Sequence, residues 1–220
     1  MPGPAASIAE RLWRENQDLA QAALAHRFVR GLADGSLPRA VFQTYVAQDA
    51  FFLDAFARAY ALALARCPDQ DGLRSFFDLL AGALDELKLH AGYAARLGID
   101  LAAIEPLPAA SAYTDFLLAT AGLGSVGETC AAMTPCMRLY AFLGQSLAER
   151  AVDGLGSNPY AEWIHTYADP AFEALASRLE GLLDRYAAAG PRLARLYRRA
   201  MRLELAFFEA PFEAPLASGG

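Results

Sequence analysis

The chain has 220 residues, of which 55% are hydrophobic and 20% are charged, and its formal net charge is −6. An acidic chain without a block of basic residues offers no electrostatic footprint for nucleic acid, so nucleic acid is excluded as an expected partner. Charged residues such as Asp49, Asp54 and Arg58 interrupt the apolar runs, so we expect no membrane-spanning helix and no membrane partner. The apolar excess therefore predicts a large buried core.

The cysteine count and the first residues bear on the cellular compartment. Three cysteines, an odd number, are typical of reduced thiols rather than of a disulfide framework. The N-terminal segment carries charge from Glu10 onward and lacks the apolar stretch of a signal peptide. We therefore expect a cytoplasmic protein.

Helical periodicity dominates the sequence, and no strand-like alternation persists. We predict a first helix over 7–33 with a break near Asn16, followed by helices over 39–67, 70–97, 109–121, 125–152, 159–166, 170–189 and 191–210. Glycine or proline stands at the boundaries, as at Gly98 and Pro191, which is typical of helix ends and starts. The predicted fold class is all-α: a single-domain helical bundle over 1–210, with 211–220 as a flexible tail.

A helical bundle can hold a di-iron site, and Glu162 with His165 forms one E-x-x-H pair. Such a site needs a second copy, but neither His26 nor His90 follows a glutamate at that spacing. We therefore expect no metal. The spacing of Glu86 and His90, four residues apart, predicts a shared helix face, and their commoner role is a local helix pair or a satisfied histidine.

The cysteines differ in their surroundings. Cys67 stands at a predicted helix end and Cys130 lies among small residues, so both are interpreted as structural. Cys136 follows Pro135 inside a helical pattern, where proline costs about 3 kcal/mol unless something compensates. Tyr140 lies one turn after Cys136 on the same face. From spacing alone the Cys136 thiol is either a buried structural group, the commoner case, or a nucleophile.

Two carboxylates also stand in apolar surroundings. A helix face brings Tyr45, Asp49 and Phe52 together, and Glu204 lies in an otherwise apolar stretch of the last helix. Because an acid is costly to bury without hydrogen bonds, such positions often mark ligand sites. A solvated face paired with a nearby arginine explains each of them equally well.

Four motifs, taken together and in this order, resemble the TenA, or thiaminase II, family. They are Phe28-Val29-x-Gly31-x-x-Asp34-Gly35-x-Leu37-Pro38, Phe42-x-x-Tyr45-Val46-x-Gln48-Asp49, Pro135-Cys136-x-x-x-Tyr140 and Trp163-Ile164-x-Thr166-Tyr167. The resemblance spans Phe28 to Phe208. It implies a haem-oxygenase-like fold, a homotetramer, no cofactor, and hydrolysis of aminopyrimidines in thiamine salvage, with cleavage of thiamine itself.

The resemblance also implies residue roles. Cys136 matches the nucleophile, and Glu204 matches the carboxylate that moves protons at the pyrimidine ring. Asp49 would bind the pyrimidine, and Tyr140 and Tyr167 would place hydroxyls around the thiol and the ring. Thiolate addition to an electron-poor ring carbon would then expel an amine from the adjacent methylene.

This sequence departs from the family pattern at several positions. Phe52 replaces a tyrosine that is common in relatives, which removes one hydroxyl. Either Ser111 or Tyr113, depending on the alignment, falls where an aromatic residue lines the pyrimidine site. Met137 and Arg138 occupy positions that are often aromatic. These changes leave the expected reaction intact but put the substrate's identity in question.

Two other functions stay open. The absent hydroxyl at Phe52 is compatible with a protein that binds a thiamine-related pyrimidine without turnover. The implied fold also allows a haem or a quinone-type ligand near His26 or His90. For the assembly, the phenylalanines Phe76, Phe77, Phe207 and Phe208 look exposed and fit an oligomer, although core packing explains them equally well.

Overall fold

The computed structural model of the protein describes residues 6–151 and 155–214, apart from the side chain of Leu89. Within these ranges the chain forms ten α-helices and one short 3-10 helix, and no strand. The elements are α1 (Ile8–Glu15), α2 (Gln17–Leu24), α3 (Arg27–Asp34), α4 (Arg39–Arg66), α5 (Gln70–Leu97), η1 (Leu101–Ala103), α6 (Pro108–Leu123), α7 (Val126–Arg150), α8 (Ala161–Ala168), α9 (Pro170–Tyr186) and α10 (Pro191–Glu213). The all-α prediction is confirmed.

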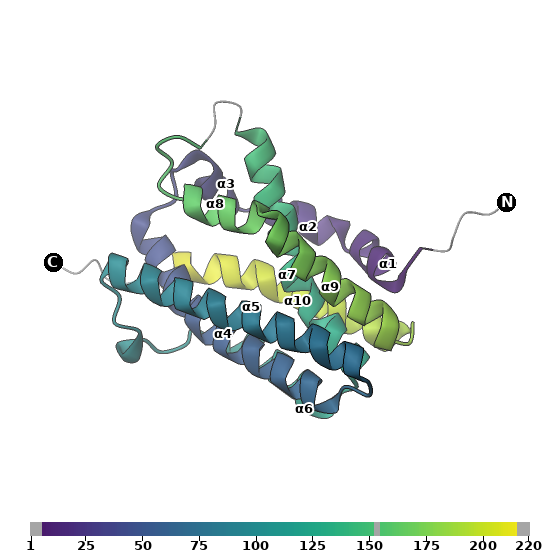
Figure 1. Ribbon diagram of the computed structural model, residues 1–220. Helices are drawn as coiled ribbons and strands as arrows, with labels where there is room; N and C mark the ends of the chain where they lie inside the picture. Colours follow the sequence, from purple (N-terminus) through teal and green to yellow (C-terminus); the bar gives the residue numbers. More distant parts are fainter. Residues whose placement is uncertain (1–5, 152–154, 215–220) are drawn as a thin grey trace.

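The long helices pack side by side around one core (Figure 1). Helix α4 lies along α5 and α6, while α7 packs against α8, α9 and α10. Helix α10 also contacts α4 and α6, so α4, α6, α7 and α10 all border the same interior. Side chains that point inward from these four helices therefore meet one another.

The predicted first helix is three helices. The expected break occurs at Asn16, whose side-chain amide donates to the Leu12 carbonyl oxygen over 2.8 Å. A second break, which the sequence analysis missed, falls at His26. The Nδ1 atom of His26 accepts a hydrogen bond from the Phe28 backbone N–H over 3.2 Å and so caps α3. Periodicity did not reveal this break because histidine is not a usual capping residue.

The last helix extends beyond the predicted end at Ala210. Pro211 lies inside α10 and is buried, and the helix ends at Glu213. The Arg27 guanidinium lies over the Phe212 ring, with Cζ 3.8 Å from the ring centroid. Tertiary contacts therefore hold this final turn in place. The predicted tail is therefore wrong at its first residues, and its part from 215 to 220 lies outside the described residues.

Three of the four phenylalanines expected at the surface are buried. Phe76, Phe207 and Phe208 have exposed fractions of 0%, 3% and 0%, whereas Phe77 is 62% exposed. Each of the three points into the shared interior, so the core-packing interpretation is correct for them. As for the membrane, no helix in the described part of the chain combines the length and apolar character that crossing one requires.

Gly144 sets the close approach of α7 to α8. A Cβ atom at this position would lie 2.4 Å from the Tyr167 carbonyl carbon and 2.6 Å from the Ala168 nitrogen. We expect Gly144→Ala to lower the free energy of unfolding by about 1–3 kcal/mol, because backbone cannot move aside as a side chain can. Urea denaturation measures this change.

Gly181 provides the matched control. This exposed glycine lies in α9, and a Cβ atom there would meet no atom within 4 Å. Gly181→Ala should leave stability unchanged or raise it by about 0.4–1 kcal/mol. Equal unfolding curves for the two variants would contradict the close-packing argument.

Candidate active site

Four helices each contribute a functional side chain to the interior. Asp49 comes from α4, Tyr113 from α6, Cys136 from α7 and Glu204 from α10. Their exposed fractions are 3%, 1%, 8% and 1%, so all four lie in the core. The structure thus brings together residues that are far apart in the sequence.

Glu204 and Cys136 form the chemical centre of this set. The Tyr113 hydroxyl donates to Glu204 Oε1 over 2.6 Å. Burial raises the pKa of Glu204 to about 7, partly offset by hydrogen bonding from Tyr113 and the Cys136 thiol. Burial, reinforced by the negative charges of Glu204, Glu86 and Asp49, raises the pKa of the Cys136 thiol. The thiol is therefore protonated at rest, and Glu204 is a neighbouring base that titrates near neutral pH.

Asp49 has an unexpected partner. His90 Nε2 lies 3.1 Å from Asp49 Oδ2, and both side chains are almost fully buried. Burial, reinforced by the negative charges of Glu86 and Glu204, raises the pKa of Asp49, and burial lowers that of His90 to about 4, so the pair is uncharged, with the carboxyl group protonated and the imidazole neutral. Among the described residues, no hydrogen-bond partner is found for Asp49 Oδ2 or His90 Nδ1. Both atoms remain able to bond to a polar ligand.

Of the two roles expected for Glu86 and His90, the local helix pair does not form. His90 turns to Asp49 of α4, and Glu86 Oε1 instead accepts a hydrogen bond from the Tyr167 hydroxyl over 2.7 Å. The two residues share a face of α5, as the spacing indicated, but each finds a partner on another helix. Periodicity gives the face of a helix and not the element that packs against it.

Aromatic residues with polar tips line one wall of the site. The Tyr45 hydroxyl lies 3.3 Å from the Tyr140 hydroxyl and accepts a hydrogen bond of 3.3 Å from Trp163 Nε1. The rings of Tyr140 and Tyr167 pack edge to face, with centroids 4.8 Å apart. Tyr45, Tyr140 and Tyr167, three of the predicted site residues, are thus neighbours of one another.

The alternative between Ser111 and Tyr113 is decided by α6. Tyr113 is buried and reaches Glu204, whereas Ser111, about 200° away round the helix, points elsewhere and does not join the site. Phe52 packs against the Tyr113 ring with centroids 4.7 Å apart. Phe52 therefore supplies a flat apolar surface beside Tyr113, the residue that bonds to the Glu204 carboxylate.

Arg138 and Met137, the two other departures from the family pattern, have different surroundings. Arg138 points to α9, where it forms ion pairs with Glu173 and Glu180 over 2.8 and 2.6 Å. It therefore serves packing between α7 and α9. Met137 instead lines a cavity of about 260 Å³ next to the site.

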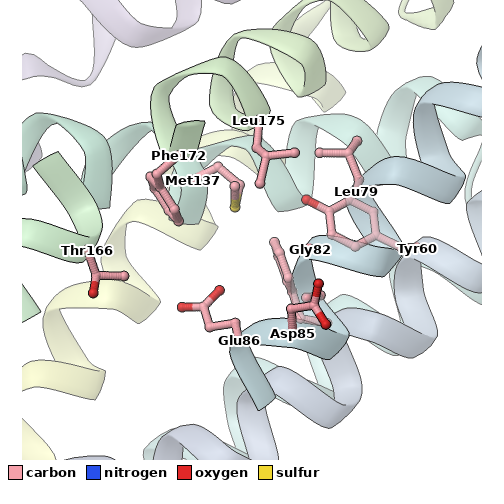
Figure 2. A pocket seen from close by; sticks show the side chains of 11 residues that line it. Tyr60, Leu79, Gly82, Asp85, Glu86, Met137, Thr166, Phe172 and Leu175 are labelled. Atoms are coloured by element: carbon pink, nitrogen blue, oxygen red, sulfur yellow. The ribbon is translucent and has the colours of Figure 1, made fainter. Parts of the chain in front are cut away.

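This cavity is bordered by α4, α5, α7, α8 and α9 (Figure 2). Its walls are mostly apolar, and Glu86 brings a carboxylate into it. The residues that line it are Phe56, Tyr60, Leu79, Gly82, Ala83, Asp85, Glu86, Met137, Thr166, Phe172 and Leu175. The sequence analysis did not assign Glu86 to a site. One signal was present, because Leu79, Ala83, Glu86 and His90 follow helical spacing and place an acid on an inward face.

The described histidines and the E-x-x-H pair of Glu162 and His165 do not form a metal site. Within the described ranges no three His, Cys, Asp or Glu side chains gather so that they could hold a metal ion. Glu162 pairs with Arg96 at the surface, and His165 is exposed. Both ring nitrogens of His26 are engaged, Nδ1 by the cap and Nε2 by Glu209 at 3.1 Å, which does not suit an axial haem ligand.

A helical bundle that encloses a thiol, carboxylates and tyrosine hydroxyls defines a small-molecule site within a haem-oxygenase-like fold. A domain of unknown function with that fold from Shewanella denitrificans superposes with a TM-score of 0.74 at 13% identity, covering 92% of this chain and 91% of that one, which shows the fold alone. The chain belongs to the TENA/THI-4/PQQC family, whose sequence profile matches residues 13–213. The family resemblance found in the sequence is thereby confirmed.

Individual relatives agree with this assignment. The chain is 38% identical over 183 residues to a protein of Halalkalibacterium halodurans named aminopyrimidine aminohydrolase, covering 81% of each chain. A TenA homologue from P. horikoshii OT3 superposes with a TM-score of 0.86 at 28% identity, covering 94% of this chain and 99% of that one.

Proposed function

We propose that the protein is an aminopyrimidine aminohydrolase of the thiaminase II type, which acts in thiamine salvage. The observation that carries the proposal is the Cys136 thiol beside Glu204, a buried carboxylate whose pKa lies near 7. The relative from Halalkalibacterium halodurans, with its printed name and 38% identity, supports the same activity.

The proposed reaction begins at the thiol. Glu204, as carboxylate, takes the proton of Cys136, and the sulfur adds to an electron-poor carbon of the aminopyrimidine ring. The bonding pair moves to a ring nitrogen, which receives the proton from Glu204. Tyr113 keeps the Glu204 carboxyl in place through its 2.6 Å hydrogen bond.

The added sulfur then makes departure of the amine possible. Electrons from the dearomatised ring form an exocyclic double bond, and the C–N bond of the protonated amine breaks with its electron pair on nitrogen, which leaves as ammonia. Water adds to the methylene carbon while the Glu204 carboxylate takes its proton. The ring then expels the thiolate, which regains the proton of the ring nitrogen as the aromatic system re-forms. The product is the hydroxymethylpyrimidine, and transfer of the Glu204 proton to the released ammonia returns the enzyme to its starting state.

Asp49 and the aromatic walls would orient the ring. The protonated Asp49 carboxyl group can both donate to a ring nitrogen and accept from the exocyclic amino group. Phe52, Tyr140 and Tyr45 are placed to pack against or around the pyrimidine. These residues thus supply binding, and Cys136 with Glu204 supplies the chemistry.

The direct test is ammonia release from 4-amino-5-aminomethyl-2-methylpyrimidine by the purified protein. We expect steady turnover. A coupled assay measures the released ammonia, and chromatography measures the hydroxymethyl product. Tight binding in calorimetry without product over hours would overturn the proposal and favour the non-catalytic binding protein.

We further propose that the protein is a cytoplasmic homotetramer. All three cysteines are free thiols, which supports a reducing compartment. Leu73, Phe77 and Leu84 of α5 are exposed apolar side chains at 37%, 62% and 45%, which supports an interface on that helix. Light scattering measures the mass of the assembly against the 23.6 kDa chain.

A further inference from the structure

The cavity of about 260 Å³ combines apolar walls with acidic charge. Its lining includes Glu86 and Asp85 but no lysine, arginine or histidine. Asp85 is exposed and paired with Lys88 over 2.9 Å, so its charge is compensated at the rim. Glu86 lies deeper and turns its carboxylate into the cavity, toward the side of Thr166 and Phe172 (Figure 2). The cavity therefore favours a cation over an anion or a neutral polar group.

The Glu86 carboxylate has unused bonding capacity. Its Oε1 accepts the hydrogen bond from Tyr167, while Oε2 receives none from the described residues. None of the described basic side chains forms an ion pair with Glu86. A carboxylate taken largely out of water normally has such a partner, and a positively charged ligand would supply one.

The cavity adjoins the proposed reaction centre. The Tyr167 ring lies between the two, because it packs on Tyr140 of the site at 4.8 Å and on Phe172 of the cavity at 5.0 Å. Phe56 of the cavity stacks on Phe52 at 5.3 Å. The cavity and the proposed reaction centre are thus separated by the thickness of one aromatic side chain.

We propose that this cavity is the leaving-group site and binds an organic ammonium ion, with the Glu86 carboxylate paired to the charged nitrogen. This inference rests on the proposed aminohydrolase function. An alkylamine, like a lysine side chain with a pKa of about 10.4, is protonated at neutral pH. When the C–N bond breaks, the nitrogen keeps the bonding pair and departs as a neutral amine, so no further proton is needed.

The chemistry fixes which kinetic constant Glu86 affects. The positive charge on nitrogen fades as the C–N bond breaks, so the carboxylate stabilises the bound substrate more than the transition state. Loss of the Glu86 charge should therefore raise KM and leave kcat unchanged or higher.

The size of the cavity selects the class of amine. A single water needs only about 10–15 Å³, so a cavity of 260 Å³ is far larger than ammonia requires. The Met137 thioether and the Phe172 ring suit an aromatic or aliphatic substituent on the nitrogen. We therefore expect N-substituted aminomethylpyrimidines as substrates. A side chain at Gly82 would narrow the cavity, since a Cβ atom there would lie 3.0 Å from Leu175 Cδ1.

Three pyrimidines that differ only in the leaving group test the proposal: the aminomethyl compound, its N-benzyl derivative, and a neutral 4-nitrophenoxymethyl analogue. For Glu86→Gln we expect KM to rise about 10- to 100-fold for both cationic substrates, as loss of a charged hydrogen bond implies. KM for the neutral analogue should change less than about threefold in this variant. Asp85→Asn, the adjacent acid at the rim, should shift KM for the cations less than about threefold.

A second variant tests the size of the site independently. Gly82→Val should lower kcat/KM for the N-benzyl substrate at least about tenfold while the aminomethyl substrate stays within about threefold. Equal losses for cationic and neutral substrates in Glu86→Gln, while the wild type is active, would overturn the leaving-group site alone. Absence of wild-type turnover with all three compounds would instead overturn the aminohydrolase function.

Discussion

Cys136→Ala should lose at least about 10³-fold in kcat for ammonia release, because no other group can supply the covalent bond to the ring. The thiol is buried beside Glu204, Tyr113 and Tyr140, so its replacement by alanine removes the nucleophile with little change in volume. Binding of the hydroxymethyl product, measured by calorimetry, should persist in the variant, since Asp49 and the aromatic walls are untouched. This variant has the largest expected effect on activity.

Cys130 is the matched control for this experiment. It lies in the same helix, is fully buried and is also a free thiol. It belongs to the packing of the core, so Cys130→Ala should keep kcat within about threefold even if stability falls. Retention of more than a tenth of the wild-type rate by Cys136→Ala would contradict covalent catalysis by this thiol.

The second large effect is expected for Glu204→Gln, which should reduce kcat about 10²- to 10⁴-fold, the usual contribution of a general base. The glutamine can still accept the Tyr113 hydrogen bond through its amide oxygen, so the site geometry is preserved. In the wild type the carboxylate must be ionised to accept the thiol proton. Because the pKa of Glu204 is about 7, the rate should rise as pH increases through that value.

The same pKa predicts an opposite effect on stability. Burial raises the pKa of Glu204 from 4.5 to about 7, so the folded state binds the proton more tightly than the unfolded chain. The stability linked to that proton is fully present below pH 4.5 and is lost as pH rises to about 7. Glu204→Gln avoids this loss, and at pH 8 its free energy of unfolding should exceed that of the wild type by up to about 3 kcal/mol.

Urea denaturation at pH 5 and pH 8 measures this gain, which should fall to about 1 kcal/mol or less at the lower pH. Glu209 of α10 is a control of opposite sign, since hydrogen bonding to Arg27 lowers its pKa. Glu209→Gln should lose stability at pH 8 rather than gain it. A Glu204→Gln variant that is less stable than the wild type at pH 8 would contradict the burial argument.

Local sequence patterns predict the helices and two groups of residues that share a helix face. Glycine marks the end of α5 and proline the start of α10, because these residues act through their own backbone chemistry. Pro211, which lies inside α10, shows that tertiary contacts can override that chemistry. The spacing of Cys136 and Tyr140, and of Tyr45, Asp49 and Phe52, follows from helical periodicity in the same way. Glu204 stands out as an acid in an apolar stretch, and the family resemblance added its role, but no local pattern shows its contact with Cys136.

Only the tertiary structure decided which inward faces meet. It paired His90 with Asp49 across two helices, turned Glu86 into a cavity, and brought Tyr113 rather than Ser111 to Glu204. Local spacing states which side of a helix is apolar, while the partner of a buried polar group depends on how distant helices pack. Burial requires each such group to find a partner, which the packing of α4 against α5 supplies for Asp49 and the Tyr167 hydroxyl of α8 supplies for Glu86.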